Sequence, residues 1–433
     1  SDIFPVIRGL IGDMIGLKSP MPIMDLRNGK EELQFLTRND LHELSTRGTA
    51  SPDHVIRIKS RPLVLRESVW SKGREAIKQE LDKYAKEYKA MFDRQEPLAN
   101  QPKTMLPTDP KNIWMEGIGL IGLGANAKAA SIAGDLVVQN ARVRAIGEDA
   151  GGFRPISEKD LFDCEYWSLE QAKLGKGAPP KFQGKIVMIT GGSGTIGFAI
   201  AEAFSKLGAQ TILVDKDETA LKKAVTKLGV GHAYFPIDVT ETDAADQAML
   251  AAIQNFGGLD ILVSNAGAAH AGPMLSISND ELRNAFELNF FSHYSFSTEA
   301  AKILKNQNRG GQILFNISKQ AVNPGKNFGA YGLPKATTFF LMRQLALELG
   351  SDGIRVNGIN ADRIRSGLLT DDFISSRAKS RGVSETEYMA GNLLNKEVKA
   401  EHVANAFTSL ACAESTTGHV MTVDGGNIEA SLR

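Results

Sequence analysis

The chain has 433 residues, of which 42% are hydrophobic and 23% charged, and its 50 basic side chains balance its 50 acidic ones. This length allows two or three domains, and the balanced charge argues against a generally basic nucleic-acid-binding protein. The longest apolar stretch, residues 118–138, is interrupted by three polar residues, so no membrane-spanning helix is expected. Cys164 and Cys412 are too few for a disulfide framework and no secretory signal is visible, so we expect a cytoplasmic protein.

A segment rich in proline and glycine divides the chain. Residues 174–180 contain two prolines and two glycines, which continue neither a helix nor a central strand, so a linker is expected there. It separates a smaller α+β region, 1–178, from a C-terminal domain, 179–433. In the first region, apolar residues recur every three or four positions between 72 and 92 and predict an amphipathic helix.

The C-terminal domain alternates apolar runs with helical patterns. Strands are predicted at 186–189, 211–214, 261–263 and 312–315, and helices at 198–207, 244–256 and 280–304. This alternation predicts βαβ units in a doubly wound parallel sheet. The runs are continuously apolar, which is typical of strands covered on both faces.

A glycine-rich turn lies between the first of these strands and the helix that follows. Backbone N–H groups at such a turn, at the positive end of a helix, approach and bind a pyrophosphate. We therefore expect the turn to bind a dinucleotide through Gly191, Ser193, Gly194, Thr195, Ile196 and Gly197.

Asp215 ends the second strand, about twenty residues beyond the turn, where a carboxylate accepts hydrogen bonds from the ribose hydroxyls. A carboxylate also repels a 2′-phosphate, so NAD is favoured over NADP, although Lys216 is a mild counter-argument. The ends of the next two strands are expected to contact the nucleotide as well, through Asp238, Val239, Asn265, Ala266 and Gly267.

Ser318 follows a predicted strand, and Tyr331 and Lys335 follow it at a spacing that places the last two on one helix face. A neighbouring ammonium favours the phenolate and lowers the pKa of a tyrosine toward neutrality. The serine hydroxyl can hold a substrate oxygen beside the tyrosine. Asn289 is expected to fix a water that connects Lys335 to solvent.

With these motifs and the closing Val423-Asp424-Gly425-Gly426, residues from about 182 to 426 resemble a short-chain dehydrogenase/reductase. The resemblance implies a Rossmann-type sheet of about seven strands. It implies that Tyr331 is the catalytic acid/base, and that Lys335 lowers its pKa and binds the nicotinamide ribose. It further implies that Ser318 orients the substrate, that Asn289 maintains a proton relay, and that the protein is a homodimer or homotetramer.

The sequence departs from the family pattern at three places. Thr195 stands at the middle glycine of the turn, where Gly194 is the substitute. Residues 360–366 replace a Pro-Gly segment and its threonine, so Ser366 is expected to contact the nicotinamide amide. Pro334 precedes Lys335 and fits a helix only if that helix begins near Tyr331.

Residues 47–57 and 161–174 resemble the middle of bacterial bifunctional class II aldolase/short-chain dehydrogenase proteins of the rhamnulose-phosphate aldolase type. That family binds zinc through histidines, but the first 178 residues hold only His42 and His54, which excludes a three-histidine site from this region. Residues 117–122 look like a degenerate aldolase segment. We therefore expect a degenerate aldolase-like region without a metal site or aldolase activity, in a chain that is a fragment or has lost that half.

Polar side chains gather where the substrate pocket is expected: Lys319, Gln320, Asn323, Lys326, His270, Arg363 and Arg365. Lipid pockets are mostly apolar, and arginine suits a carboxylate or phosphate, so a small polar substrate is expected. The predicted contacts are Lys319, Gln320, Arg363 and Arg365; alternatively, these charges lie in solvent at the rim. The resemblance suggests a sugar, polyol, sugar acid or lactaldehyde-like substrate.

The residues favour an NAD-dependent oxidoreductase that moves a hydride to or from a carbinol carbon. Two other functions stay open. A catalytically inert nucleotide-binding regulator is supported by the altered turn and loop, and an aldolase is opposed by the missing histidines.

Overall fold

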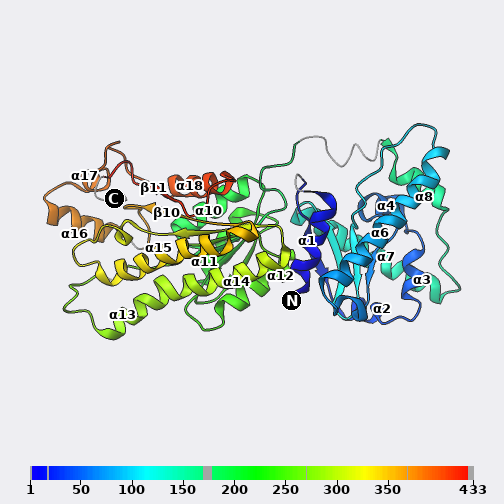
Figure 1. The fold of residues 1–433 in the computed structure, drawn as a ribbon, viewed down its shortest axis with the longest axis horizontal. Helices are drawn as coiled ribbons and strands as arrows, with labels where there is room; N and C mark the ends of the chain where they lie inside the picture. The colour runs from blue at the N-terminus through cyan, green and yellow to red at the C-terminus, as the bar shows by residue number, and fades with distance from the viewer. Residues whose placement is uncertain (1, 17–18, 169–177, 270, 368, 428–433) are drawn as a thin grey trace. The chain divides into compact units, whose positions relative to one another are not determined.

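The computed structural model describes residues 2–16, 19–168, 178–269, 271–367 and 369–427 (Figure 1). The chain divides into two compact units, Ser1–Gly184 with Ile253–Gly258, and Lys185–Ala252 with Leu259–Arg433. We call them the N-terminal unit and the C-terminal unit. Residues 174–177 of the expected linker lie outside the described residues.

The C-terminal unit is built on a seven-stranded sheet with the order β11-β10-β9-β8-β5-β6-β7. All neighbouring strands are parallel, which confirms the predicted Rossmann-type doubly wound sheet. The strands are β5 (Ile186–Thr190), β6 (Gln210–Asp215), β7 (Ala233–Pro236), β8 (Ile261–Ser264), β9 (Gly311–Asn316), β10 (Ile354–Ala361) and β11 (Val420–Val423).

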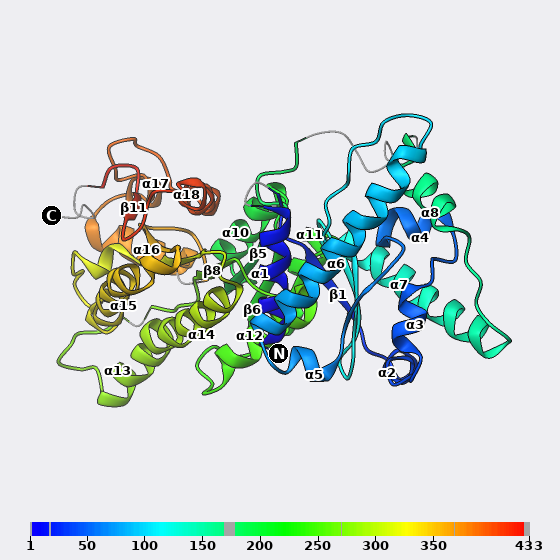
Figure 2. The same cartoon turned by 45° about the vertical axis from the view of Figure 1, so that its right-hand side comes forward.

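Helices cover both faces of this sheet, which explains the continuous apolarity of its strands. The helices that follow β5 in the chain are α10 (Thr195–Lys206), α11 (Glu218–Leu228), α12 (Ala244–Phe256), α13 (Asn279–Phe286), α14 (Ser292–Gln307), α15 (Gly329–Leu349), α16 (Asp371–Arg381), α17 (Glu385–Met389) and α18 (Ala400–Cys412). The pair α10 and α18 packs on one face and the pair α14 and α15 on the other (Figures 1 and 2). All five residues of β5 are buried between them.

The order of the strands creates a switch point between β5 and β8, where a functional site is expected. The chain runs outward from β5 to β6 and β7 and then returns to β8 on the other side of β5. Loops at the carboxyl ends of β5 and β8 therefore separate, and in open parallel sheets a crevice for a ligand forms at this switch point.

Two predicted helices differ from the structure. The helix expected at 280–304 is interrupted between α13 and α14 by a π-helical turn, Glu287–Phe291. Helix α15 begins at Gly329, two residues before Tyr331, so Pro334 lies inside the helix rather than in its first turn. Because proline has no N–H, it makes no backbone hydrogen bond to the preceding turn. Short 3-10 turns lie at Glu96–Leu98, Lys319–Ala321 and Gly350–Asp352.

The N-terminal unit contains a four-stranded mixed sheet with the order β1-β4-β3-β2. Its strands are β1 (Ile23–Arg27), β2 (Leu63–Leu65), β3 (Asn112–Met115) and β4 (Gly119–Gly124). Its helices are α1 (Ile3–Ile15), α2 (Lys30–Leu36), α3 (Leu41–Thr46), α4 (Pro52–Ile58), α5 (Glu67–Trp70), α6 (Arg74–Gln95), α7 (Ala127–Asp149) and α8 (Glu158–Glu165). Helix α6 is the helix predicted at 72–92.

Glycines allow α7 to lie directly on β4. A Cβ atom at Gly122 would stand 2.2 Å from the backbone nitrogen of Gly134 in α7, so a larger residue would push the helix away. Beneath this contact Trp114 is buried, and its ring meets that of Phe35 edge-on with centroids 4.9 Å apart. The 117–122 segment is thus a turn and a core strand of this unit.

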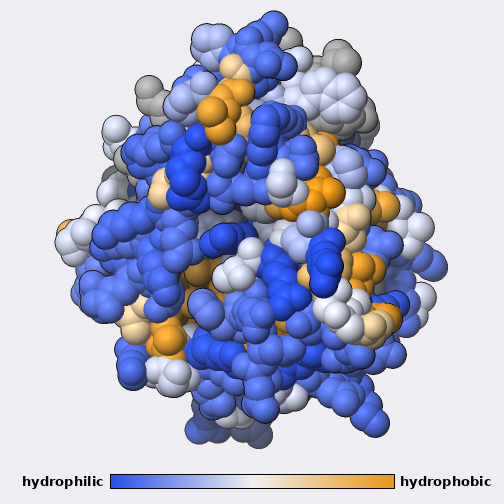
Figure 3. Space-filling model, turned by 90° about the vertical axis from the view of Figure 1, so that its right-hand side faces the viewer, coloured by the Kyte–Doolittle hydropathy of each residue, from blue (hydrophilic) through white to orange (hydrophobic). Residues whose placement is uncertain are grey.

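The surface of the N-terminal unit seen in Figure 3 is mainly hydrophilic, with hydrophobic side chains in small separate groups. In the described part of the chain, no helix combines the length and apolarity that crossing a membrane would require.

Candidate active site

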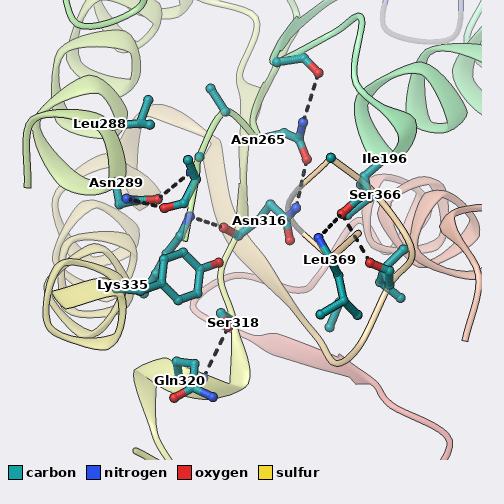
Figure 4. A pocket seen from close by; sticks show the side chains of 18 of the residues that line it. Ile196, Asn265, Leu288, Asn289, Asn316, Ser318, Gln320, Lys335, Ser366 and Leu369 are labelled. Atoms are coloured by element: carbon teal, nitrogen blue, oxygen red, sulfur yellow. Dashed lines mark hydrogen bonds between the residues drawn. The ribbon is translucent and has the colours of Figure 1, made fainter. Parts of the chain in front are cut away.

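A cavity of 1250 Å³ lies at the carboxyl ends of the strands of the C-terminal unit. Its walls come from the turns and loops after β5, β6, β8, β9 and β10, as the switch point predicts. Figure 4 shows part of its lining. Among the described residues that the sequence predicted to form the site, Ser193 and Arg365 are not part of the lining.

The glycine turn meets the cavity at the start of α10. Gly194 is the N-cap residue, and Gly194, Thr195, Ile196 and Gly197 face the cavity. A Cβ at Gly197 would stand 2.1 Å from the carbonyl oxygen of Gly191, so this position requires glycine. The N–H groups of a first helical turn have no partner within the helix, so this wall suits a phosphate group.

Asp215 lies at the end of β6 and lines the cavity. Its carboxylate accepts hydrogen bonds from the backbone N–H (3.2 Å) and the hydroxyl (2.7 Å) of Ser193. Ser193 therefore contributes by holding Asp215 rather than by lining the cavity.

Asp238 lies just beyond β7, and its carboxylate accepts hydrogen bonds from the N–H and hydroxyl of Thr240. Lys216, 3.8 Å from this carboxylate, is largely exposed. Burial raises the pKa of Asp238, but the hydrogen bonds from Thr240 and the charge of Lys216 outweigh it, so the pKa lies below its usual value.

A chain of hydrogen bonds connects the glycine turn with Lys335 (Figure 4). The side-chain amide of Asn265 donates to the carbonyl of Thr190 (3.0 Å), and that of Asn316 donates to Asn265 (2.8 Å). The Nζ of Lys335 donates to the carbonyl of Asn316 (3.1 Å). Hydrogen bonds thus connect the two parts of the site across the ends of β5, β8 and β9.

Tyr331 and Lys335 lie one turn apart on α15, with the Nζ of Lys335 5.8 Å from the centre of the tyrosine ring. Ser318, the N-cap of the short helix Lys319–Ala321, forms a side-chain hydrogen bond with Tyr331. Burial raises the pKa of Tyr331 to about 12, although the bond with Ser318 lowers it. Burial therefore decides the direction of this shift, and the lowering of the pKa that was expected from Lys335 is not seen.

Sequence reasoning missed a residue behind Lys335. His293 is fully buried; its Nε2 lies 3.3 Å from the Nζ of Lys335, and its Nδ1 lies 2.6 Å from the hydroxyl of Ser264. Burial and the neighbouring charge of Lys335 hold the pKa of His293 well below its usual value, so the neutral ring accepts from Lys335. Its position one helical turn after Asn289 was a signal available in the sequence.

Asn289 is buried in the π-helical turn, where a shift of the backbone bonding changes which carbonyls are paired. Its side-chain amide donates to the carbonyls of Ala268 and Ala285, and its own carbonyl accepts the hydroxyl hydrogen bond of Thr338 (2.8 Å). The turn thus fastens α15 and the loop after β8 to one residue.

Comparison with known families decides the identity of this unit. Residues 192–427, more than half of the chain, match the family described as Enoyl-(Acyl carrier protein) reductase. The chain belongs to the short-chain dehydrogenase/reductase family. This is a family of NAD(P)-dependent oxidoreductases.

Two solved short-chain dehydrogenase/reductase structures resemble this unit. The L-sorbose reductase from Gluconobacter frateurii, complexed with NADPH and L-sorbose, is 29% identical with a TM-score of 0.53, over 57% of this chain and 98% of that one. The 3-ketoacyl-(acyl-carrier-protein) reductase from Brucella melitensis, complexed with NADH, is 25% identical with a TM-score of 0.50, over 56% and 98%.

The N-terminal region has relatives of its own. Residues 1–174 match the family described as Aldolase class II, second domain, so the chain joins an aldolase-type region to a short-chain dehydrogenase/reductase domain. It is 31% identical over 446 residues to the uncharacterized oxidoreductase YuxG of Bacillus subtilis, which covers 98% of this chain. The chain spans only 63% of the length of that relative.

Most of the predicted substrate residues line the cavity, but several of their polar groups already have partners within the protein. Lys319 forms an ion pair of 2.9 Å with the buried Asp362, and the side chain of Gln320 accepts a hydrogen bond from the backbone N–H of Gly325. Ser366 lines the cavity, but its hydroxyl bonds within its own loop, to the carbonyl of Ile364. Arg363 lines the cavity with a backbone φ of 48°.

Arg365 does not reach the cavity. Its guanidinium pairs with Glu397 and Asp371 outside it, and its side chain is 41% exposed, so it is withdrawn as a substrate contact. His270 lies outside the described residues.

The cavity walls fit a dinucleotide. They combine the N–H groups at the start of α10, a glycine at position 197 where a Cβ atom would clash, and the carboxylate of Asp215 at the end of β6. Within the described ranges, no group of three or more histidine, cysteine, aspartate or glutamate side chains is arranged to hold a metal ion. His54 bonds to Ser51 in the N-terminal unit, with 2.7 Å between its Nδ1 and the serine hydroxyl.

Proposed function

We propose that the chain is an NAD-dependent oxidoreductase that interconverts a carbinol and a carbonyl group of a small polar substrate. The observation that carries the proposal is the sharing of one cavity by the glycine turn and by Ser318, Tyr331 and Lys335. The bound dinucleotide supplies or accepts the hydride.

Each residue of the site has a distinct role in this proposal. With a pKa near 12, Tyr331 is protonated at neutral pH and can donate its proton to a carbonyl oxygen that becomes a hydroxyl. In the reverse direction it takes the hydroxyl proton. Ser318 holds the reacting oxygen beside the phenol. Lys335, when charged, stabilises the phenolate, and Asn289 fixes the loop and helix that meet behind it.

The test is absorbance at the reduced nicotinamide band, with NAD and polyols, sugar acids or hydroxyaldehydes as substrates. We expect turnover, and we expect Tyr331→Phe to lower kcat by at least about 1000-fold because it removes the proton donor. Tyr294→Phe is the matched control, since Tyr294 is 47% exposed and does not line the cavity. Turnover that survives Tyr331→Phe would refute the assignment.

The preference for NAD rests on Asp215. A carboxylate at the end of β6 accepts ribose hydroxyls and repels a 2′-phosphate. Replacing Asp215 by Ser should lower kcat/KM with NAD about tenfold and raise it with NADP. If the ratio of kcat/KM with NAD to kcat/KM with NADP did not change, the result would oppose this preference. The test is needed because the similar solved structures include one complex with NADH and one with NADPH.

The substrate class rests on the charged and polar side chains in one part of the cavity wall, such as Lys319, Gln320 and Arg363, and on the similarity to the L-sorbose reductase. We propose a sugar, polyol, sugar acid or lactaldehyde-like compound. Turnover of apolar ketones, with none of these compounds, would reject the class. The cytoplasmic location and the homo-oligomeric assembly stay predictions.

We also propose that the N-terminal region, 1–178, has no aldolase activity, because its two histidines are too few for a three-histidine zinc site. Incubation with ketose 1-phosphates and zinc should release no aldehyde. Release of an aldehyde that a chelator abolishes would overturn this proposal.

A further inference from the structure

One part of the cavity wall carries an excess of positive charge. Between residues 316 and 388, the lining contains one carboxylate, Asp362, and five basic residues besides Lys335. They are Lys319, Lys326, Arg363, Arg377 and Arg381. Asp362 neutralises part of this charge, because it pairs with Lys319 at 2.9 Å and with Arg363 at 3.5 Å.

Arg377 and Arg381 are not neutralised in this way. They lie one turn apart on α16, and among the described residues no carboxylate is within ion-pair distance of either. The Nε of Arg377 is buried and has no hydrogen-bond partner in the described part of the chain. A buried donor without a partner is costly, and Arg377 lines the cavity, so an acceptor group that reaches its guanidinium from the cavity would stabilise this arrangement.

Aromatic rings hold these guanidinium groups in place. The guanidinium carbon of Arg377 lies 5.5 Å from the ring centre of Phe328, and that of Arg381 lies 5.4 Å from the ring centre of Tyr388. Arg363 lies 4.8 Å from the same Tyr388 ring. Guanidinium groups held over aromatic rings have fewer orientations open to them, and the planar group can bind an oxyanion with two parallel hydrogen bonds.

The arginine side chains lie in the same cavity wall as the helix that carries Tyr331. Phe328, which Arg377 contacts, is the N-cap residue of the helix that carries Tyr331. Arg363 adopts a backbone conformation with φ of 48°, which is rare outside glycine, and the loop after β10 holds it in the cavity wall.

We propose that Arg377 and Arg381 form a subsite for an oxyanion of the substrate, a carboxylate or a phosphate. The proposal rests on the proposed function, because it assigns one end of the same substrate. In this proposal, Arg377 and Arg381 take the role that the sequence analysis gave to Arg365. They are four residues apart on one helix and therefore lie on the same helix face.

The experiment measures anion binding by calorimetry, with inorganic phosphate and malonate as separate probes and with the chain saturated with NADH. Saturation keeps the probes out of the dinucleotide phosphate site. We expect at least one probe to bind, and Arg377→Met and Arg381→Met each to raise its Kd at least tenfold. The probe that binds more tightly identifies the oxyanion as phosphate or carboxylate.

Three controls make the result specific. Arg343→Met changes an exposed position of α15 outside the cavity lining and should leave the Kd of the probe unchanged. Arg377→Lys keeps the charge and should raise the Kd less than Arg377→Met does. Tyr331→Phe should bind the probe as the wild type does. Unchanged affinity in both methionine variants, or no binding of either probe, overturns the subsite. Failure to bind NADH instead contradicts the proposed function, and the anions are then titrated into the ligand-free chain.

Discussion

Burial acts in opposite directions on the two neighbouring titratable groups of the candidate active site. It raises the pKa of Tyr331 to about 12 and lowers that of Lys335 to about 7. The phenol is therefore protonated at neutral pH, whereas the charge of Lys335 changes with pH in the physiological range. We expect the charge on Lys335 to be the pH-sensitive element of the site.

This lowered pKa predicts a pH-dependent stability. Between pH 7 and 10.5 the unfolded chain binds more protons at Lys335 than the folded chain does, so the contribution of Lys335 to the stability of the wild type rises with pH in this window. The free energy of unfolding of Lys335→Met, minus that of the wild type, should fall by about 1 kcal/mol per pH unit there. Denaturant unfolding at several pH values measures it, and a difference that does not vary with pH would contradict the burial of this lysine.

His293 is expected to position Lys335. Its neutral ring accepts a hydrogen bond from the ammonium, and the loss of one such bond costs about 1.5 kcal/mol, or about tenfold in rate. His293→Leu should therefore lower kcat about tenfold and shift the pH profile of kcat, while His293→Gln, which keeps an acceptor, should restore part of both. A wild-type pH profile in His293→Leu would show that the ring only fills space.

At the scale of the element, the start of α10 provides a matched pair of glycines, Gly194 at the N-cap and Gly197 in the first turn of the helix. A Cβ at Gly197 would stand 2.1 Å from a backbone oxygen, whereas one at Gly194 would have its nearest neighbour at 3.4 Å. Gly197→Ala should destabilise the chain by about 3 kcal/mol and abolish dinucleotide binding, and Gly194→Ala should cost less than about 1 kcal/mol. Denaturant unfolding with NADH titration tests both, and equal effects of the two substitutions would contradict the geometry of the turn.

Local patterns predict the elements that depend on local chemistry. The buried strands β5, β6, β8 and β9 are apparent as continuous apolar runs, and the glycine turn and Asp215 follow from their places at strand ends. The Ser318, Tyr331 and Lys335 spacing likewise placed all three residues at one cavity. In each case, the parallel sheet itself brings strand ends together.

Tertiary contacts decide what the patterns missed. In the π-helical turn, the backbone carbonyl of Asn289 accepts a hydrogen bond from the hydroxyl of Thr338 on another helix, and nothing in the local sequence indicates that partner. Arg365 and Arg377 are equally basic in sequence, but Glu397 and Asp371 pair with the first, and the fold turns the second toward the cavity. Charge in a loop therefore predicts a binding residue poorly without the fold.

For the whole molecule, all residues that line the cavity belong to the C-terminal unit. A dinucleotide at 100 times its Kd stabilises the folded state by about 2.7 kcal/mol. Hydrogen exchange should therefore show NADH-dependent protection in β5, β6 and the turn between β5 and α10, with none in β1 to β4 of the N-terminal unit. Protection confined to the N-terminal unit would place the dinucleotide at a different site.

The most direct test of the account is a crystal structure of the chain with NADH bound. We predict the pyrophosphate on the turn from Gly191 to Gly197, the ribose hydroxyls of the adenosine on Asp215, and the nicotinamide ring beside Tyr331 and Lys335. A dinucleotide bound elsewhere, or Tyr331 and Lys335 turned away from its nicotinamide ring, would contradict the proposed reaction.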